Sequence, residues 1–103
     1  MDVNFDITAA QLKELIDSGQ PFHFLDVRNE DEYEEDNLGA KLIPLGDLPD
    51  SIEDLTAWKG EDIYIHCRSG ARSDRAKRYL ISEGFDKVHN VLGGILAYRD
   101  LPE

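Results

Sequence analysis

Strand-like and helix-like segments alternate along this 103-residue chain, and this alternation restricts the fold more than any other feature. Short apolar runs predict buried strands, and amphipathic stretches between them predict helices. The strand-like segments are 21–27, 41–45, 61–67 and 87–91, and the helix-like segments are 8–19, 51–58, 71–84 and 93–101. Because the connections are short, this order predicts an α/β fold in which helices cover both faces of a parallel sheet. The length suits one compact domain, and we expect a single domain over 1–103.

Local signals predict where the helices begin. Thr8 is followed three residues later by Gln11, which has the form of a capping box. Ser51 is the expected N-cap of the helix over 51–58. The acidic stretch 29–36 is interpreted as a solvated helical turn or loop without a functional role.

The charge of the chain is divided unevenly. The sequence carries 22 acidic and 11 basic side chains, a net charge of −11. Residues 1–66 contain 17 acids and 4 bases, whereas residues 67–103 contain 5 acids and 7 bases. The overall charge argues against nucleic-acid binding, which needs Lys and Arg to neutralise phosphates, and against a basic membrane anchor. Since the sequence also lacks a membrane-spanning apolar stretch and a secretory signal pattern, we expect a cytoplasmic protein without nucleic-acid or membrane partners.

The single cysteine of the chain, Cys67, lies where the sign of the charge changes. Alone it forms neither an internal disulfide nor a thiolate zinc site, and the three histidines are scattered, so no metal site and no cofactor is expected. Two interpretations of this cysteine remain. It is either a small buried apolar side chain, as most free cysteines are, or a nucleophile.

The segment 67–73, Cys-Arg-Ser-Gly-Ala-Arg-Ser, joins the end of a predicted strand to the start of a predicted helix. Ligands of parallel sheets bind beyond the carboxyl ends of the strands. A tight loop at such an end turns backbone N–H groups inward to bind an anion, and Gly70 permits the required backbone angles. Arg68, Arg72 and the positive end of the helix add to this field. Such surroundings lower the pKa of a cysteine from about 8.5 to ~3.5–7.5, which favours a thiolate nucleophile beside an anion site.

The segment 66–73 resembles the active-site loop of the rhodanese-like family of single-domain sulfurtransferases. Three more segments match the family in the same order, so the resemblance covers nearly the whole chain. They are Asp26-Val27-Arg28 with Glu32-Tyr33, Gly39-Ala40 with Ile43-Pro44-Leu45, and Leu92-Gly93-Gly94-Ile95 with Ala97-Tyr98. The segment 36–40 is one residue shorter than the family's usual G-H-I-x-G-A and lacks its Gly-His pair, and Tyr98 replaces a tryptophan. Both departures concern the pocket rim and the choice of donor.

The resemblance implies a small rhodanese-like fold with a central, mainly parallel five-stranded sheet. It also implies that Cys67 takes the outer sulfur of a small anionic donor such as thiosulfate as a persulfide. An acceptor, cyanide in an assay or a thiol in the cell, then removes the sulfur; a protein acceptor remains open. The rest of the loop would bind the substrate: Arg68, Ser69, Gly70, Ala71, Arg72 and Ser73. The arginines would attract the donor and the two serine hydroxyls would donate hydrogen bonds, although Ser73 could instead favour the helix start.

Two other functions stay open. Cysteine phosphatases and arsenate reductases also carry Cys and Arg on a strand–loop–helix, but with C-x5-R spacing, whereas Cys67 and Arg72 are spaced C-x4-R. The shorter loop gives a smaller ring of donors than three phosphoryl oxygens need, and no acid in 30–36 stands out as a general acid. The other alternative is a non-catalytic rhodanese-like module that binds a partner. Such modules often lack the cysteine, and the acidic stretch 26–62 would suit a basic partner or simply keep the protein soluble.

Asp26 and Arg28 end a predicted strand near this loop and are assigned a supporting role, as a structural ion pair or loop anchor, with Arg28 also meeting Glu32. His66 precedes the cysteine, but neighbouring side chains of a strand point to opposite faces, so we interpret it as structural. Four more residues are interpreted as structural, surface or packing groups: His23, His89, Trp58 and Tyr98.

Overall fold

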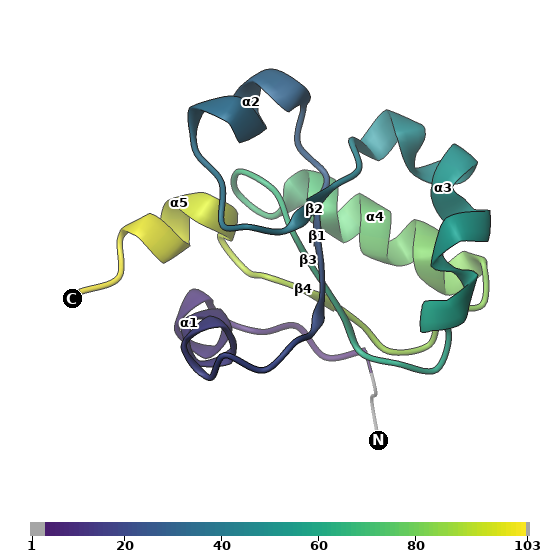
Figure 1. Cartoon of the computed structure of the whole chain (residues 1–103), viewed down its shortest axis with the longest axis horizontal. Helices are drawn as coiled ribbons and strands as arrows, with labels where there is room; N and C mark the ends of the chain where they lie inside the picture. The colour runs from purple at the N-terminus through teal and green to yellow at the C-terminus, as the bar shows by residue number, and fades with distance from the viewer. Residues whose placement is uncertain (1–3, 103) are drawn as a thin grey trace.

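The computed structural model describes residues 4–102, and its sheet has four parallel strands in the order β2–β1–β3–β4 (Figure 1). The strands are β1 (His23–Asp26), β2 (Lys41–Leu42), β3 (Ile63–His66) and β4 (Val88–Asn90). The helices are α1 (Ala9–Asp17), α2 (Glu30–Glu35), α3 (Leu48–Leu55), α4 (Ala71–Ser82) and α5 (Gly94–Arg99). Short 3-10 turns, η1 (Leu45–Asp47) and η2 (Thr56–Trp58), flank α3.

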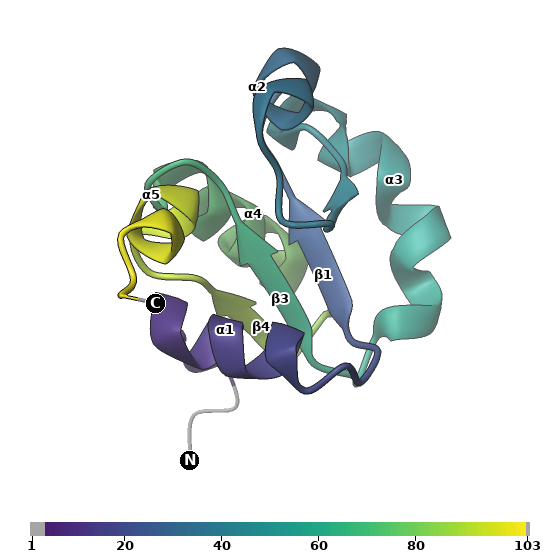
Figure 2. The ribbon, with the colours of Figure 1, turned by 60° about the vertical axis from the view of Figure 1, so that its left-hand side comes forward.

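Helices cover both faces of the sheet, which confirms the predicted α/β fold (Figure 2). One face packs against α3 and α4, through a buried cluster that includes Leu25, Ile65 and Leu80. The other face packs against α1 and α5, through a second cluster that includes Phe24 and Leu12. Because neighbouring side chains of a strand point to opposite faces, Phe24 and Leu25 belong to different clusters. No helix within residues 4–102 is long and apolar enough to cross a membrane.

Within residues 4–102 the sheet has four strands, so the expected number of five is wrong. Outside the four strands there is one isolated parallel bridge, between Ile7 and Val91, among the described residues. The Ile7 amide donates to the Asn90 carbonyl at 3.0 Å, and the Leu92 amide donates to the Ile7 carbonyl at 2.9 Å. The pairing ends there because Thr8 is already the N-cap of α1.

The helix starts were predicted with mixed success. The capping box of α1 is confirmed, because Thr8 Oγ1 accepts from the Gln11 amide at 3.1 Å and Gln11 Oε1 accepts from the Thr8 amide at 2.9 Å. The N-cap role of Ser51 is wrong: α3 begins at Leu48, with Pro49 in its first turn, and the Ser51 hydroxyl donates back to the Asp47 carbonyl at 3.1 Å. Proline suits that first turn because amides there lack helical partners.

Candidate active site

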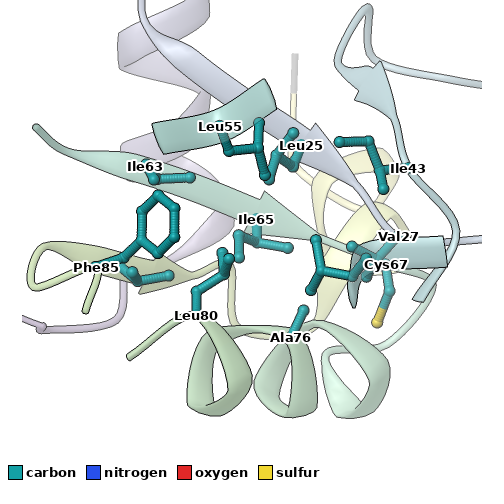
Figure 3. Packing of buried hydrophobic residues seen from close by; sticks show 12 residues of the cluster. Leu25, Val27, Ile43, Leu55, Ile63, Ile65, Cys67, Ala76, Leu80 and Phe85 are labelled. Atoms are coloured by element: carbon teal, nitrogen blue, oxygen red, sulfur yellow. The ribbon is translucent and has the colours of Figure 1, made fainter. Parts of the chain in front are cut away.

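Cys67 directly follows the carboxyl end of β3 and begins the loop that leads into α4. Its side chain joins the apolar cluster between the sheet and α4, at the end of the row of core residues (Figure 3). Only 1% of its surface is exposed. The cysteine is therefore a buried side chain, as the first interpretation expected, and its role as a nucleophile stays a prediction.

The sulfur of Cys67 faces hydrogen-bond donors from its own loop and from the first turn of α4. The Gly70 amide lies 3.1 Å from Sγ, and the Ser73 hydroxyl lies 3.4 Å from it. Burial by itself raises the pKa of the Cys67 thiol, but hydrogen bonds from the Ser73 hydroxyl and from the backbone amides of Ser73, Gly70 and Ser69 outweigh burial. The net result is a pKa below the ordinary thiol value, which enlarges the thiolate fraction near neutral pH.

Two glycines shape this loop. Gly70 has φ +107°, a left-handed conformation that side chains rarely adopt, and it is the N-cap of α4. Ser73 lies inside the first turn of α4, so it is not the cap. Gly94, at the start of α5, touches the loop so closely that a Cβ there would lie 2.5 Å from the carbonyl oxygens of Cys67 and Arg68. The close approach lets α5 hold the loop by its backbone: the Ile95 amide donates to the Cys67 carbonyl at 3.0 Å.

The two arginines of the loop have different surroundings. Arg72 forms a two-pronged ion pair with Glu32 of α2, at 2.7 and 2.8 Å. This hydrogen-bonded pairing lowers the pKa of Glu32 to about 2. Arg68 is exposed, has no ion pair within residues 4–102, and borders a small cavity of about 200 Å³. Two more arginines, Arg28 and Arg99, line the same cavity, but each of them is paired with an aspartate.

Asp26 and Arg28 form a buried ion pair at the end of β1. The Asp26 carboxylate accepts from the Arg28 backbone amide at 3.0 Å and from Nη2 at 2.7 Å. Arg28 also donates to the Asp36 carbonyl at 2.7 Å, which ties the chain after α2 to the sheet. The expected contact with Glu32 reaches only its backbone carbonyl, at 3.4 Å. The carboxylate of Glu32 turns to Arg72 instead, a pairing that nothing in the run of acids predicted.

His66 lies behind the loop and away from the sulfur. Its ring packs against Phe24, on the sheet face opposite to Cys67, with ring centroids 5.2 Å apart. Burial lowers the pKa of His66, and its Nδ1 lies 3.2 Å from the Cys67 carbonyl oxygen. The neutral ring thus supports the backbone of the loop.

Asn90 is a buried site residue that the sequence did not single out. It ends β4, and its Nδ2 donates to the Gly70 carbonyl at 3.2 Å. Its Oδ1 accepts from the Ser73 hydroxyl at 2.5 Å. The available signal was an uncharged polar residue near the end of the strand-like segment 87–91. The structure thus brings Cys67, Gly70, Ser73 and Asn90 together, while Ser69 and Ala71 lie on the exposed side of the loop.

The chain is an α/β domain with a parallel sheet, and its cysteine lies in the loop between a strand and a helix. More narrowly, the model of the Rhodanese-like domain matches residues 8–101, and the chain belongs to that family. The family resemblance inferred from the motifs is therefore confirmed.

Related proteins agree with this membership. "Putative sulfurtransferase YtwF" of Bacillus subtilis is 38% identical over 95 residues, which cover 91% of this chain and 89% of the relative. YrkF of the same organism is 37% identical over 91 residues, but this chain spans only about half (48%) of its length. The crystal structure of a rhodanese-like domain protein from Staphylococcus aureus superimposes with a TM-score of 0.73 at 34% identity, covering 92% of this chain and 90% of that one. These relatives support a sulfurtransferase class.

Proposed function

We propose that this protein transfers sulfane sulfur through a persulfide on Cys67, from a donor such as thiosulfate to a thiol or to cyanide. The observation that carries the proposal is the set of hydrogen-bond donors around Sγ, with the Gly70 amide at 3.1 Å and the Ser73 hydroxyl at 3.4 Å. These donors favour the thiolate, which is the form of cysteine that attacks.

In the first step the Cys67 thiolate attacks the outer sulfur of thiosulfate. A new S–S bond forms, the S–S bond of thiosulfate breaks, and sulfite leaves with the electron pair. The persulfide keeps one negative charge on its terminal sulfur. Amides of the loop hold this charge as an oxyanion hole holds oxygen, since they are fixed before the charge arrives.

In the second step a nucleophilic acceptor attacks the terminal sulfur. Cyanide leaves as thiocyanate, or a thiolate leaves as a persulfide, and the Cys67 thiolate is restored in either case. A thiol acceptor, small or on a protein, needs a reducing compartment, which supports a cytoplasmic location.

Charged groups around the loop have different roles: some attract the anionic donor, and others support the loop. Arg68, exposed at the cavity of about 200 Å³, attracts the anion. Arg72 is shared with Glu32, so it contributes less net charge. Asp26 and Arg28 support the loop from beneath, because their buried pair fixes the end of β1 beside β3.

The test is to incubate the protein with thiosulfate, record its intact mass, and then add cyanide. We expect a gain of one sulfur atom that is lost as thiocyanate, and no gain in Cys67→Ala. A variant of an exposed serine at the far end of α4, Ser82→Ala, is the control and should still load. Failure to load from several donors would refute the proposal. Turnover of an aryl phosphate would then indicate a phosphatase, and neither activity would indicate a binding module.

A further inference from the structure

The hydroxyl of Ser73 lies between two hydrogen-bond acceptors. On one side the Cys67 sulfur is 3.4 Å from Ser73 Oγ, and on the other side Asn90 Oδ1 is 2.5 Å away. All three side chains are buried, with exposed fractions of 0% for Ser73, 1% for Cys67 and 4% for Asn90. Bulk water is therefore excluded as an alternative partner for the hydroxyl.

The orientation of the Asn90 amide follows from its second contact. The Gly70 carbonyl, 3.2 Å from Asn90 Nδ2, only accepts hydrogen bonds, so the NH2 group must face it. The Asn90 backbone is fixed as well, because its amide donates to Asp6 Oδ1 at 3.0 Å and its carbonyl accepts from Ile7. The amide oxygen is therefore held toward Ser73.

A hydroxyl has one hydrogen to donate, and an amide oxygen has none. At 2.5 Å the Ser73 hydrogen must lie between the two oxygens, so it points at Asn90 and away from the sulfur. We propose that Asn90 is a positioning residue that competes with the Cys67 sulfur for the single hydroxyl proton of Ser73.

The competition depends on the state of the sulfur. In the thiol, the S–H group donates to Ser73 and Ser73 donates to Asn90, so every group is satisfied. In the thiolate, the Ser73 proton turns to the sulfur and Asn90 Oδ1 loses its donor. In the persulfide, Sγ carries no charge and the proton returns to Asn90. Asn90 thus favours the uncharged forms of Sγ and restrains the thiolate, which also keeps the thiolate more nucleophilic.

This inference rests on the proposed role of Cys67 as nucleophile, but its test does not need sulfur transfer. The measurement is the rate of iodoacetamide alkylation of Cys67 against pH, which reports the thiolate fraction directly. If sulfur loading fails while these profiles behave as expected, the proposed function fails and the role of Asn90 stands.

The variants are Ser73→Ala, Asn90→Ala and the double variant. We expect Asn90→Ala to speed alkylation about threefold at a pH below the midpoint, which is the size of one modest hydrogen bond. Ser73→Ala should slow alkylation by a similar factor. In the Ser73→Ala background, Asn90→Ala should change nothing, because the contested proton is gone.

Two further variants separate this role from simple support of the Gly70 carbonyl. Asn90→Leu fills the volume without an acceptor, and Asn90→Asp keeps the acceptor and adds negative charge. We expect the Leu variant to speed alkylation and the Asp variant to slow it. Equal shifts with and without Ser73, or shifts of the same sign in all three Asn90 variants, would overturn the inference. Thermal unfolding of each variant shows which of them are folded at the assay temperature.

Discussion

The two ends of the parallel sheet hold different polar groups. At the carboxyl end, the Gly70 amide and the Ser73 hydroxyl lie within hydrogen-bonding distance of the Cys67 sulfur. At the amino end, His23 faces Glu61 at 2.6 Å and stacks on Trp58, with ring centroids 4.2 Å apart. The amino end also has the larger hollow, about 600 Å³ against about 200 Å³ beside Arg68.

Strand direction therefore places the candidate site at the end of the sheet that has the smaller hollow. At the carboxyl end a strand stops and a helix begins, so backbone amides without helical partners gather at one point. At the amino end, the His23 ring and the Glu61 carboxylate already contact each other beside the hollow.

Gly94→Ala should damage sulfur transfer most among the changes that leave Cys67 in place. The new Cβ would lie 2.5 Å from the carbonyl oxygens of Cys67 and Arg68, so the loop must move. A displacement of about 1 Å at a reacting group costs on the order of 100-fold in rate. The measurement is the rate of thiocyanate formation. Gly46→Ala is the matched control, because a Cβ there meets nothing within 4 Å, and it should keep full activity. An active Gly94→Ala would show that loop geometry matters little.

Features that depend on local sequence were predictable, whereas contacts between distant segments were not. Apolar periodicity and capping residues act locally, so the alternating elements and the start of α1 were predictable. The cysteine loop was predictable too, since a glycine and two arginines follow Cys67 within five residues. These features require no knowledge of distant contacts.

Contacts between distant segments were not predictable in the same way. The Glu32–Arg72 pair joins residues 40 positions apart, and five neighbouring acids compete for the same role in 30–36. Asn90 meets Ser73 only because β4 lies beside β3. The start of α3 was missed since Ser51 is a good cap by type, but Pro49 already suits the first helical turn.

Asp26→Asn should cost the most stability. It leaves the buried Arg28 guanidinium without its counter-charge, and breaking a buried pair in this way destabilises by about 3–5 kcal/mol. Urea denaturation measures the change in the free energy of unfolding. Asp17→Asn removes the same charge from an exposed pair with Lys13 and should change stability little. Similar losses of unfolding free energy in both variants would mean that the buried Asp26–Arg28 pair stabilises the fold no more than an exposed pair does.

Glu32→Gln should improve the use of thiosulfate. Removing the carboxylate frees Arg72 for the donor, and we expect KM for thiosulfate to fall about threefold, the size of a partly exposed charge pair. Glu30→Gln, an equal charge change on the exposed side of α2, should leave KM unchanged. Equal effects in both variants would mean that Glu32 acts on KM only through the overall charge of the protein and not through Arg72.

The same pair has a signature in stability. The folded pKa of Glu32, about 2, lies below its ordinary value of 4.5. Its contribution is therefore complete above pH 4.5 and is lost as the pH falls toward 2. Glu32→Gln should flatten the acid side of the stability profile in that range.

Glu61→Gln, at the amino end, should have the smallest effect. The change weakens the contact with His23 beside the larger hollow, but that hollow lies at the end of the sheet opposite to Cys67. Sulfur loading and KM should match the unaltered protein. A loss of transfer in this variant would break the contrast between the two ends.

The central claim is that a thiolate activated by its loop carries the sulfur, and the pH dependence of single-turnover loading tests it most directly. Loading of Cys67 from thiosulfate is followed by intact mass across a pH series, beside the alkylation rate of the same cysteine. The two profiles should share one midpoint, below the ordinary thiol pKa. A loading rate that does not follow the thiolate fraction, or a shared midpoint at or above the ordinary value, would contradict this account.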